Sequence, residues 1–246
     1  MKKSNVIYGI HPVSEALEAS KTFEKVLIQK GLQIDNMRKL MPMLREASVP
    51  LQYVPKAKLD RITRKNHQGI IAYISPIEYA NLEWLLPALY EKGETPLFVI
   101  ADHITDVRNF GALCRSAECA GAHGIIIPAR GAAQINEDAV KTSAGALLRI
   151  PVCKEKSLTD TAAFLQNSGV KVLGCHESGE APYFAADLRM PLAIVMGAED
   201  TGISPAMEEA LDGSIHIPMA GSVGSLNVSA AASVVLFDAV RQRREV

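Results

Sequence analysis

The sequence predicts an α/β protein with a small N-terminal α/β domain and a larger C-terminal domain built on a mostly parallel sheet. From residue 97 onward, short apolar stretches typical of buried strands alternate with helical stretches, the pattern of a parallel sheet covered on both faces. Residues 1–75 hold a shorter alternation of their own. With 246 residues, 48% of them hydrophobic, the chain is long enough to bury a core.

The N-terminal domain, residues 1–75, is predicted from periodicity. Helical spacing of apolar residues or extended apolar runs define its elements: helices over 11–20 and 37–48, and strands over 23–31, 51–55 and 69–75. Residues 76–95 are interpreted as a connecting segment, because prolines and a glycine border a short run of helically spaced leucines. The second domain then spans residues 96–246.

The C-terminal domain alternates strands and helices in order along the chain. We expect strands at 97–102, 124–129, 170–176, 192–197 and 214–219, and helices at 109–121, 136–150, 204–211 and 227–244. In such sheets ligands bind where loops leave the carboxyl ends of the strands. The loops after these strands are therefore the candidate positions for function.

Charge is distributed unevenly along the chain. Residues 1–80 carry thirteen Lys and Arg against seven Asp and Glu, a balance of +6, whereas the rest of the chain balances at −7. The segment 56–65 gathers five cations, Lys56, Lys58, Arg61, Arg64 and Lys65. A basic surface serves either solubility or phosphate binding. The clustering of these cations favours RNA or DNA.

Several classes of protein are not indicated. No stretch approaches the roughly 18 to 20 apolar residues of a membrane span, and no apolar segment follows the N-terminal lysines, so we expect a cytoplasmic protein without membrane contact. The four cysteines form no CxxC pair and have no partnered His spacing, so we expect neither a metal site nor disulfides.

Polar residues are concentrated in three loops. In the first, Asn109 opens a helix either as a plain N-cap or as a functional amide. Arg115 follows on this helix among small and apolar residues that indicate burial, and a buried charge needs a partner or a phosphate. The second loop holds Gly197, Glu199 and Gly202, a weak signal alone because strand-to-helix turns often use glycine and acids.

The third loop, AGSVGSLNVS, precedes the last helix. Gly221 and Gly224 allow close backbone approach, and Ser225 and Asn227 supply a hydroxyl and an amide near a helix N-terminus. A capped core helix explains one polar residue at this position but not the whole set. No loop matches GxGxxG or GxxxxGK[ST], and no Ser-His-Asp or metal-ligand pattern is present.

Three stretches in order, NFGALCRSAECAG, VMGAEDTGIS and IPMAGSVGSLNVSAAASVVLFDAVRQR, resemble the motifs of the SpoU (TrmH-like) RNA ribose 2'-O-methyltransferases of the SPOUT superfamily. The N-terminal YGIHPVSEAL and HQGIIA are similar to the substrate-binding domain of the subgroup that methylates a guanosine of 23S rRNA. The resemblance spans nearly the whole chain. It implies a C-terminal α/β knot, a mostly parallel sheet with a deep trefoil knot, and a small N-terminal RNA-binding domain.

The resemblance also implies S-adenosylmethionine as the cofactor, held in a bent pose by the threaded loops. Carried over by motif, its contacts are Val195, Met196, Gly197, Gly202, Ile217, Pro218, Met219 and Leu226. Arg108, Phe110 and the sequence AEDTGIS depart from the common pattern. These departures bear on RNA specificity more than on the chemistry.

The reaction requires a ribose 2'-hydroxyl placed in line with the sulfonium methyl group, so positioning carries much of the catalysis. The resemblance implies catalytic roles for Asn109, Arg115, Glu199, Ser225 and Asn227, with Ser229 beside them. We expect Arg115 to orient the phosphate and polarise the hydroxyl, because a neutral arginine, which a general base requires, is costly. Glu199 is expected to orient its neighbours rather than act as the base.

The expected activity is 2'-O-methylation of a guanosine ribose in 23S rRNA. Methylation of tRNA, or a non-catalytic role in RNA binding or ribosome assembly, remain the alternatives. The polar set argues against the non-catalytic role, and the basic N-terminal domain favours rRNA. The resemblance implies dimerisation through the knot. The last helix has an apolar face that includes Val235 and Phe237, which either covers the sheet or adds to a subunit interface, and we expect a homodimer. RNA, and not DNA, is the expected partner.

Overall fold

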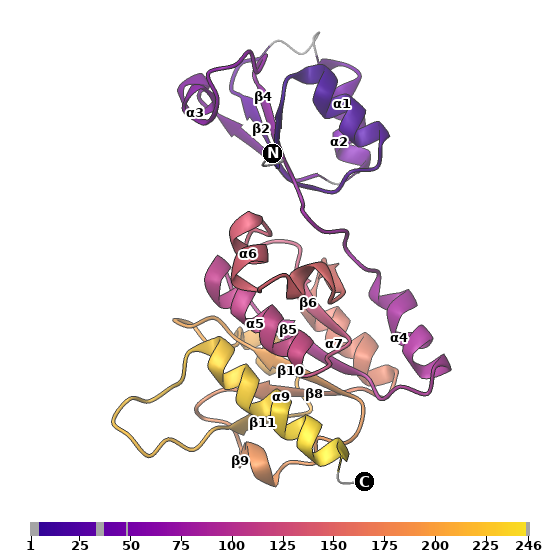
Figure 1. Ribbon diagram of the computed structural model, residues 1–246, viewed down its shortest axis with the longest axis vertical. Coiled ribbons are helices and arrows are strands. Elements are labelled where there is room, and N and C mark those ends of the chain that lie inside the picture. Colours follow the sequence, from indigo (N-terminus) through magenta and orange to yellow (C-terminus); the bar gives the residue numbers. More distant parts are fainter. Residues whose placement is uncertain (1–4, 33–36, 48, 245–246) are drawn as a thin grey trace. The chain divides into compact units, whose positions relative to one another are not determined.

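A computed structural model describes residues 5–32, 37–47 and 49–244 (Figure 1). The chain divides into two compact units, and the main boundary between them falls between Glu78 and Tyr79. Each unit has its own sheet. The two sheets confirm the predicted class, a mixed α/β protein with a separate small N-terminal domain.

The N-terminal unit is a four-stranded sheet in the order β1-β4-β2-β3. Strand β4 pairs antiparallel with both β1 and β2, and β2 pairs parallel with β3. Its elements in chain order are β1 (Val6–Tyr8), α1 (Ile10–Glu18), β2 (Phe23–Gln29), α2 (Leu40–Glu46), β3 (Leu51–Val54), α3 (Lys56–Ile62) and β4 (Ile70–Ile74). The predicted helix over 37–48 is present as α2, and its last predicted residue, Ser48, lies outside the described residues.

Both faces of the small sheet are covered, because successive side chains of a strand point to opposite sides. Val26 and Ile28 of β2 pack in one core cluster with Val13 of α1 and Leu40 of α2. The residue between them, Leu27, belongs to a second cluster with Leu59 of α3 and Ile71 of β4. The basic segment 56–65 therefore has one buried anchor, Leu59, and its five cations are exposed.

The C-terminal unit is built on a seven-stranded sheet in the order β7-β6-β5-β10-β8-β11-β9, with every neighbouring pair parallel. Its strands are β5 (Leu97–Ala101), β6 (Gly124–Pro128), β7 (Val152–Glu155), β8 (Lys171–Cys175), β9 (Ala181–Pro182), β10 (Leu192–Met196) and β11 (Gly213–His216). Its α-helices are α4 (Leu82–Glu91), α5 (Val107–Cys119), α6 (Glu137–Thr142), α7 (Leu158–Asn167), α8 (Pro205–Glu208) and α9 (Val228–Arg244). Two 3-10 turns, η2 (Ala146–Leu148) and η3 (Tyr183–Ala185), complete the unit.

Helices cover this sheet on both faces. Alternate residues of the central strands, Phe98 on β5 and Val195 on β10, lie in a core cluster with residues of α4, α7 and α8. Val99, which follows Phe98, and Ile194, which precedes Val195, are also fully buried and point to the opposite face. Helices α5 and α9 pack against each other on that side (Figure 1). The continuous apolar strands thus reflect burial on both faces, as the sequence pattern predicts.

Two predicted segments differ from the structure. The connecting segment 76–95 contains α4, whose leucines Leu82, Leu86 and Leu89 are buried in the core of the C-terminal unit, so this helix belongs to that unit. The predicted helix over 136–150 is interrupted after Thr142. Ala144 and Gly145 have φ angles of 50° and 83°, a left-handed conformation that ends a helix, and the short turn η2 follows. No helix within the described ranges is long and apolar enough to cross a membrane.

Candidate functional site

A cavity of about 690 Å³ lies at the carboxyl edge of the parallel sheet. It is formed where β10, β8 and β11, three adjacent strands, end. The loop after β8 contributes His176, Glu177 and Ser178, the loop after β10 contributes Gly197 to Ile203, and the loop after β11 contributes Ile217, Met219, Gly224, Ser225 and Leu226. Val228 and Ala231 at the start of α9 complete the wall. Loops that are distant in sequence therefore converge on one site, as expected for this class of sheet.

The loop after β10 is tightly folded. Ala198 and Gly202 exchange two backbone hydrogen bonds, of 3.0 Å and 2.9 Å. A Cβ atom added at Gly197 would lie 2.1 Å from the carbonyl carbon of Gly202, so a side chain does not fit without moving the backbone. Gly202 itself has a φ of +68°, which favours glycine. The loop keeps its shape because of these two glycines.

A buried carboxylate holds the same loop at its far end. Asp102, directly after β5, is 1% exposed, and its Oδ2 accepts a 2.6 Å hydrogen bond from the backbone N–H of Ser204. Its other oxygen is bonded to the Nδ1 atom of His103. Both oxygens of this buried acid are therefore used, and the loop after β10 is fixed to the neighbouring strand.

A chain of polar side chains lies beside the cavity. Asn109 Nδ2 donates a 2.8 Å hydrogen bond to Glu199 Oε2, and Asn227 Nδ2 donates a 2.9 Å bond to Asn109 Oδ1. Ser229 Oγ donates a 2.7 Å bond to Asn227 Oδ1. The helix cap of α5 is Asp106, which accepts the backbone N–H of Asn109, so the Asn109 amide is free to make these contacts. Asn109 is thus not the plain N-cap of its helix.

The structure brings most of the predicted site residues together. Met196, Gly197, Gly202, Ile217, Met219 and Leu226 line the cavity, as do Glu199 and Ser225. Asn109 and Asn227 belong to the polar chain. Val195 is fully buried in the core on the face covered by α7, and Pro218 lies next to the lining without being part of it.

Arg115 is placed differently from the sequence-based expectation. We expected it to leave a buried helix face and to need a partner, but the side chain is exposed on α5. Within the described part of the chain, no hydrogen bond or ion pair of its guanidinium is found, and water can solvate the charge. Arg115 lies outside the polar chain that links Asn109, Glu199 and Asn227.

Sequence reasoning missed the contribution of β8. His176 Nε2 lies 2.9 Å from Glu208 Oε1, an ion-pair distance when the imidazole is protonated, although the approach lacks hydrogen-bond alignment. His176 Nδ1 is 3.1 Å from Ser178 Oγ. The predicted strand 170–176 ends at His176, so its position at the carboxyl edge was a usable signal. Among the residues that the structure describes, the lining includes four carboxylates, Glu177, Glu199, Asp200 and Glu208, and no lysine or arginine.

The fold and the convergent loops define a small-molecule-binding parallel α/β domain joined to a separate small domain. The model of the SpoU rRNA methylase family matches residues 96–237, and a model described as RNA 2'-O ribose methyltransferase substrate binding matches residues 6–80. The chain therefore belongs to the SpoU rRNA methylase family.

Individual relatives agree with this assignment. YacO of Bacillus subtilis (strain 168), whose name places it in the TrmH family of tRNA/rRNA methyltransferases, is 34% identical over 245 residues, covering 100% of this chain and 98% of that protein. The SpoU methyltransferase AviRb from Streptomyces viridochromogenes, solved in complex with AdoMet, has a TM-score of 0.63 and 26% identity, covering 98% of this chain and 91% of that one. A TrmH/SpoU tRNA modifying enzyme from A. aeolicus has a TM-score of 0.56 and 31% identity, covering 67% and 85%.

Proposed function

We propose that this protein transfers a methyl group from S-adenosylmethionine to a ribose 2'-hydroxyl of RNA, and that its target is a guanosine of 23S rRNA. Family membership supports RNA methylation, and the matched substrate-binding model supports ribose 2'-O chemistry. The AdoMet complex of AviRb supports the cofactor. The observation that carries the proposal is the polar chain of Asn109, Glu199 and Asn227 beside a loop-lined cavity.

The cavity has the properties that this cofactor requires. Its volume of about 690 Å³ lies within the range of roughly 300 to 1,000 Å³ typical of small-molecule sites. Met196, Ile203 and Leu226 provide apolar surface for an adenine, and the carboxylates favour a ligand with positive charge. S-adenosylmethionine supplies an electrophilic methyl group on a cationic sulfur. The residues present therefore fit the group.

The polar chain positions the ribose. Glu199 Oε2 accepts the hydrogen bond from Asn109, which leaves Oε1 available for the hydroxyl of a ribose. Asn109 is itself held by Asn227, so the carboxylate direction is fixed before substrate binds. Ser225, in the lining, adds a hydroxyl that can hold the sugar. Because these groups are in place before the substrate binds, the ribose is held in the geometry that the reaction requires.

We propose that Arg115 acts on the RNA phosphate. An exposed guanidinium is the side chain best suited to bidentate phosphate contact. Its separation from the polar chain is consistent with a homodimer in which Arg115 of one subunit serves the cavity of the other. The dimer is part of the proposal.

The choice of rRNA rests on the N-terminal unit. Its exposed cations Lys56, Lys58, Arg61, Arg64 and Lys65 form a surface suited to RNA phosphates. The tRNA alternative remains a second candidate because relatives are named for both RNA classes.

The test is methyl transfer from labelled S-adenosylmethionine to 23S rRNA and tRNA transcripts, followed by mapping of the modified ribose. Modification of one 23S guanosine at its 2'-oxygen is the expected result. Methylation of tRNA alone would overturn the proposed substrate, and no transfer to any RNA, including ribosomal precursor particles, would support the non-catalytic role.

A further inference from the structure

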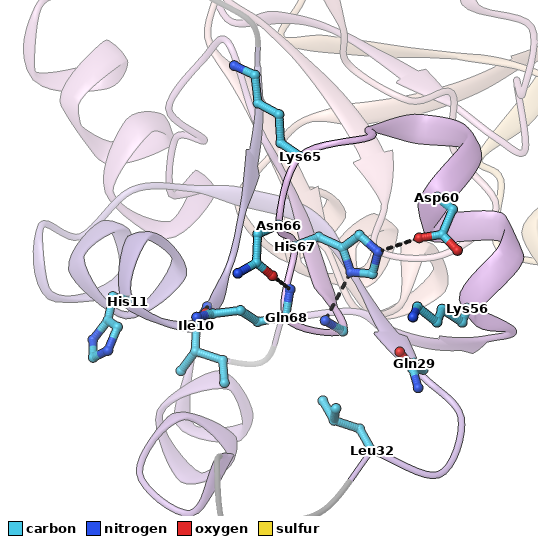
Figure 2. Close-up of a pocket in the computed structure, with 11 residues that line it drawn as sticks. Ile10, His11, Gln29, Leu32, Lys56, Asp60, Lys65, Asn66, His67 and Gln68 are labelled. Atoms are coloured by element: carbon cyan, nitrogen blue, oxygen red, sulfur yellow. Dashed lines mark hydrogen bonds and ion pairs between the residues drawn. The ribbon is translucent and has the colours of Figure 1, made fainter.

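A second cavity, of about 730 Å³, lies entirely within the N-terminal unit. It opens between the start of α1, the end of β2, helix α3 and the turn that precedes β4 (Figure 2). We call it the His67 pocket; the residues that matter here are Ile10, Gln29, Leu32, Lys56, Asn66 and His67. The methyl-transfer site of the C-terminal unit uses none of them.

His67 forms a buried wall of this pocket. It is 6% exposed, its Nε2 lies 2.9 Å from Asp60 Oδ1, and its Nδ1 is 3.0 Å from the backbone nitrogen of Gly69. Because Nδ1 accepts the Gly69 N–H, the ring proton sits on Nε2 and is donated to Asp60. The imidazole therefore holds the turn before β4 against helix α3.

The same turn is kept in an uncommon conformation. Gln68 has a φ of +51°, which costs a residue other than glycine some free energy, and its Oε1 accepts a 3.0 Å hydrogen bond from the backbone N–H of Ile10. Gly69 follows with a φ of +80°, and a Cβ atom there would lie 2.7 Å from Leu32 Cδ1. The turn is thus held by the Gln68 hydrogen bond to Ile10 and by the close approach of Gly69 to Leu32, and both Ile10 and Leu32 line the pocket.

Polar groups around the pocket are left with unused hydrogen-bonding capacity. Asn66 Oδ1 accepts the Gln68 N–H at 3.4 Å, and Figure 2 shows its Nδ2 pointing away from this turn. On the other side of the pocket lie the Gln29 amide and the Lys56 ammonium (Figure 2). Among the residues that the structure describes, none bonds to Asn66 Nδ2, to the Gln29 side chain or to Lys56 Nζ. Ile10 and Leu32 add apolar surface.

We propose that the His67 pocket binds one unstacked nucleotide of the RNA substrate. The base lies against Ile10 and Leu32, its edge bonds to the amides of Asn66 and Gln29, and its phosphate pairs with Lys56. An apolar surface, amides and a cation in one cavity match the three parts of a nucleotide. The proposal rests on the proposed RNA methylation and names the part of the RNA that the N-terminal domain reads. A base within a duplex does not enter, so the pocket selects loops or single strands.

The experiment measures RNA affinity of the full-length protein by fluorescence anisotropy. The probes are fluorescein-labelled rU, rA, rC and mixed-sequence oligomers of about ten nucleotides, and a duplex of the same length. Asn66→Ala should weaken binding of at least one single-stranded oligomer about tenfold, change the ranking of the oligomers, and leave the duplex unaffected. Lys56→Met should weaken single strands by a similar factor and reduce the slope of log affinity against log salt by about 0.7.

Lys58→Met is the matched control. Lys58 lies on the same helix, is exposed, and does not line the pocket. It should affect single strands and duplex alike and leave the ranking unchanged. Equal effects of Lys56→Met and Lys58→Met on all probes, or an unchanged ranking in Asn66→Ala, would overturn the pocket assignment. Asn66→Asp is a second variant that keeps the side-chain shape and so is expected to fold as the wild type does. Thermal unfolding of the variants checks that they are folded.

The outcome separates this inference from the proposed function. If the wild-type protein methylates RNA while the pocket variants bind every probe normally, the pocket assignment is wrong and the methyltransferase proposal stands. If the wild type methylates no RNA but the pocket variants lose single-strand binding, the methyltransferase proposal is wrong and the pocket assignment stands. Affinity for S-adenosylmethionine, measured by calorimetry, should be unchanged in all pocket variants.

Discussion

Asn109 and Glu199 are 90 positions apart in the sequence, and a 2.8 Å hydrogen bond joins their side chains. The bond connects the first turn of α5 to the loop after β10, one of the loops that form the cavity. Asn109 does not itself line the cavity. In the proposed function it acts on the reaction by holding Glu199, so its loss should separate catalysis from cofactor binding.

Asn109→Asp tests this separation. The substitution keeps the shape of the side chain but replaces the amide donor by a carboxylate facing Glu199, so the bond is lost and two like charges are opposed. We expect kcat for methyl transfer to fall about 10- to 100-fold, the equivalent of one charge-assisted hydrogen bond, with little change in calorimetric affinity for S-adenosylmethionine.

Asn167→Asp is the control for this change. Asn167 is exposed at the end of α7, and the same substitution there adds a charge far from the polar chain. Its kcat should equal that of the wild type. Equal kcat in Asn109→Asp would show that the Asn109 contact does not position Glu199.

Gly197→Ala should abolish cofactor binding. The added methyl group would meet the backbone of Gly202 at 2.1 Å, so the loop must open and the cavity wall with it. Gly221→Ala adds the same atom in the loop after β11, where nothing lies within 4 Å, and should bind the cofactor normally. Calorimetry with S-adenosylhomocysteine compares the two. Wild-type affinity in Gly197→Ala would place the cofactor elsewhere.

Mixing two inactive proteins tests whether a site is shared between subunits. Arg115→Ala lacks the exposed guanidinium, and Leu226→Arg disrupts the cavity wall. If Arg115 of one subunit serves the cavity of its partner, a mixed dimer holds one intact site and methyl transfer partly returns. If each site is built within one chain, no mixture recovers activity. If light scattering shows a monomer, the protein is not a homodimer and a site cannot be shared between subunits.

Buried thiols should make the protein less stable at high pH. Burial raises the pKa of Cys175 to about 11, and burial together with Glu155 raises the pKa of Cys153 to about 12, from a usual value of 9.0. The folded state therefore keeps protons that the unfolded chain loses, so the stabilisation is complete below about pH 9 and is lost as pH rises toward these values.

Urea denaturation at several pH values measures this effect. Cys153→Ala removes one buried thiol and should give a shallower fall in the free energy of unfolding between about pH 9 and pH 11. Cys119→Ala, at the exposed cysteine, should follow the wild type. Identical pH slopes in all three proteins would contradict a proton-linked contribution from Cys153.

The architecture could be predicted from the sequence because strands and helices follow from the local pattern of apolar residues along the chain. Continuous apolar runs such as 192–197 predict strands buried on both faces. Their parallel arrangement predicts that the loops that follow them share one edge, as the loops after Met196 and His216 do. Asn109, Glu199 and Asn227 were singled out by motif, and the structure joins them by hydrogen bonds.

Other features depend on contacts that no local pattern encodes. The spacing of leucines in 82–89 shows that the segment is amphipathic but not which unit it covers, so the sequence predicts a connection where the structure has α4. The exposure of Arg115 depends on where its helix face points, not on the small size of its neighbours. The His67 pocket depends on the left-handed Gln68 and on a bond from His67 to Asp60, seven residues before it.

The cavity draws its walls from Cys175 to Ala231, and α9 supplies the last of them. Ribosomes make a chain from its N-terminus, and early domains fold while later ones are still being synthesised. The N-terminal unit consists of the chain up to Glu78 and of Ile135–Glu137, all of which precede Cys175, so its fold can be complete when none of the cavity has yet been made. The cavity proposed for the cofactor is among the last parts of the molecule to be synthesised. A chain interrupted anywhere before Val228 lacks the part of the wall that Val228 and Ala231 form, whatever else has folded.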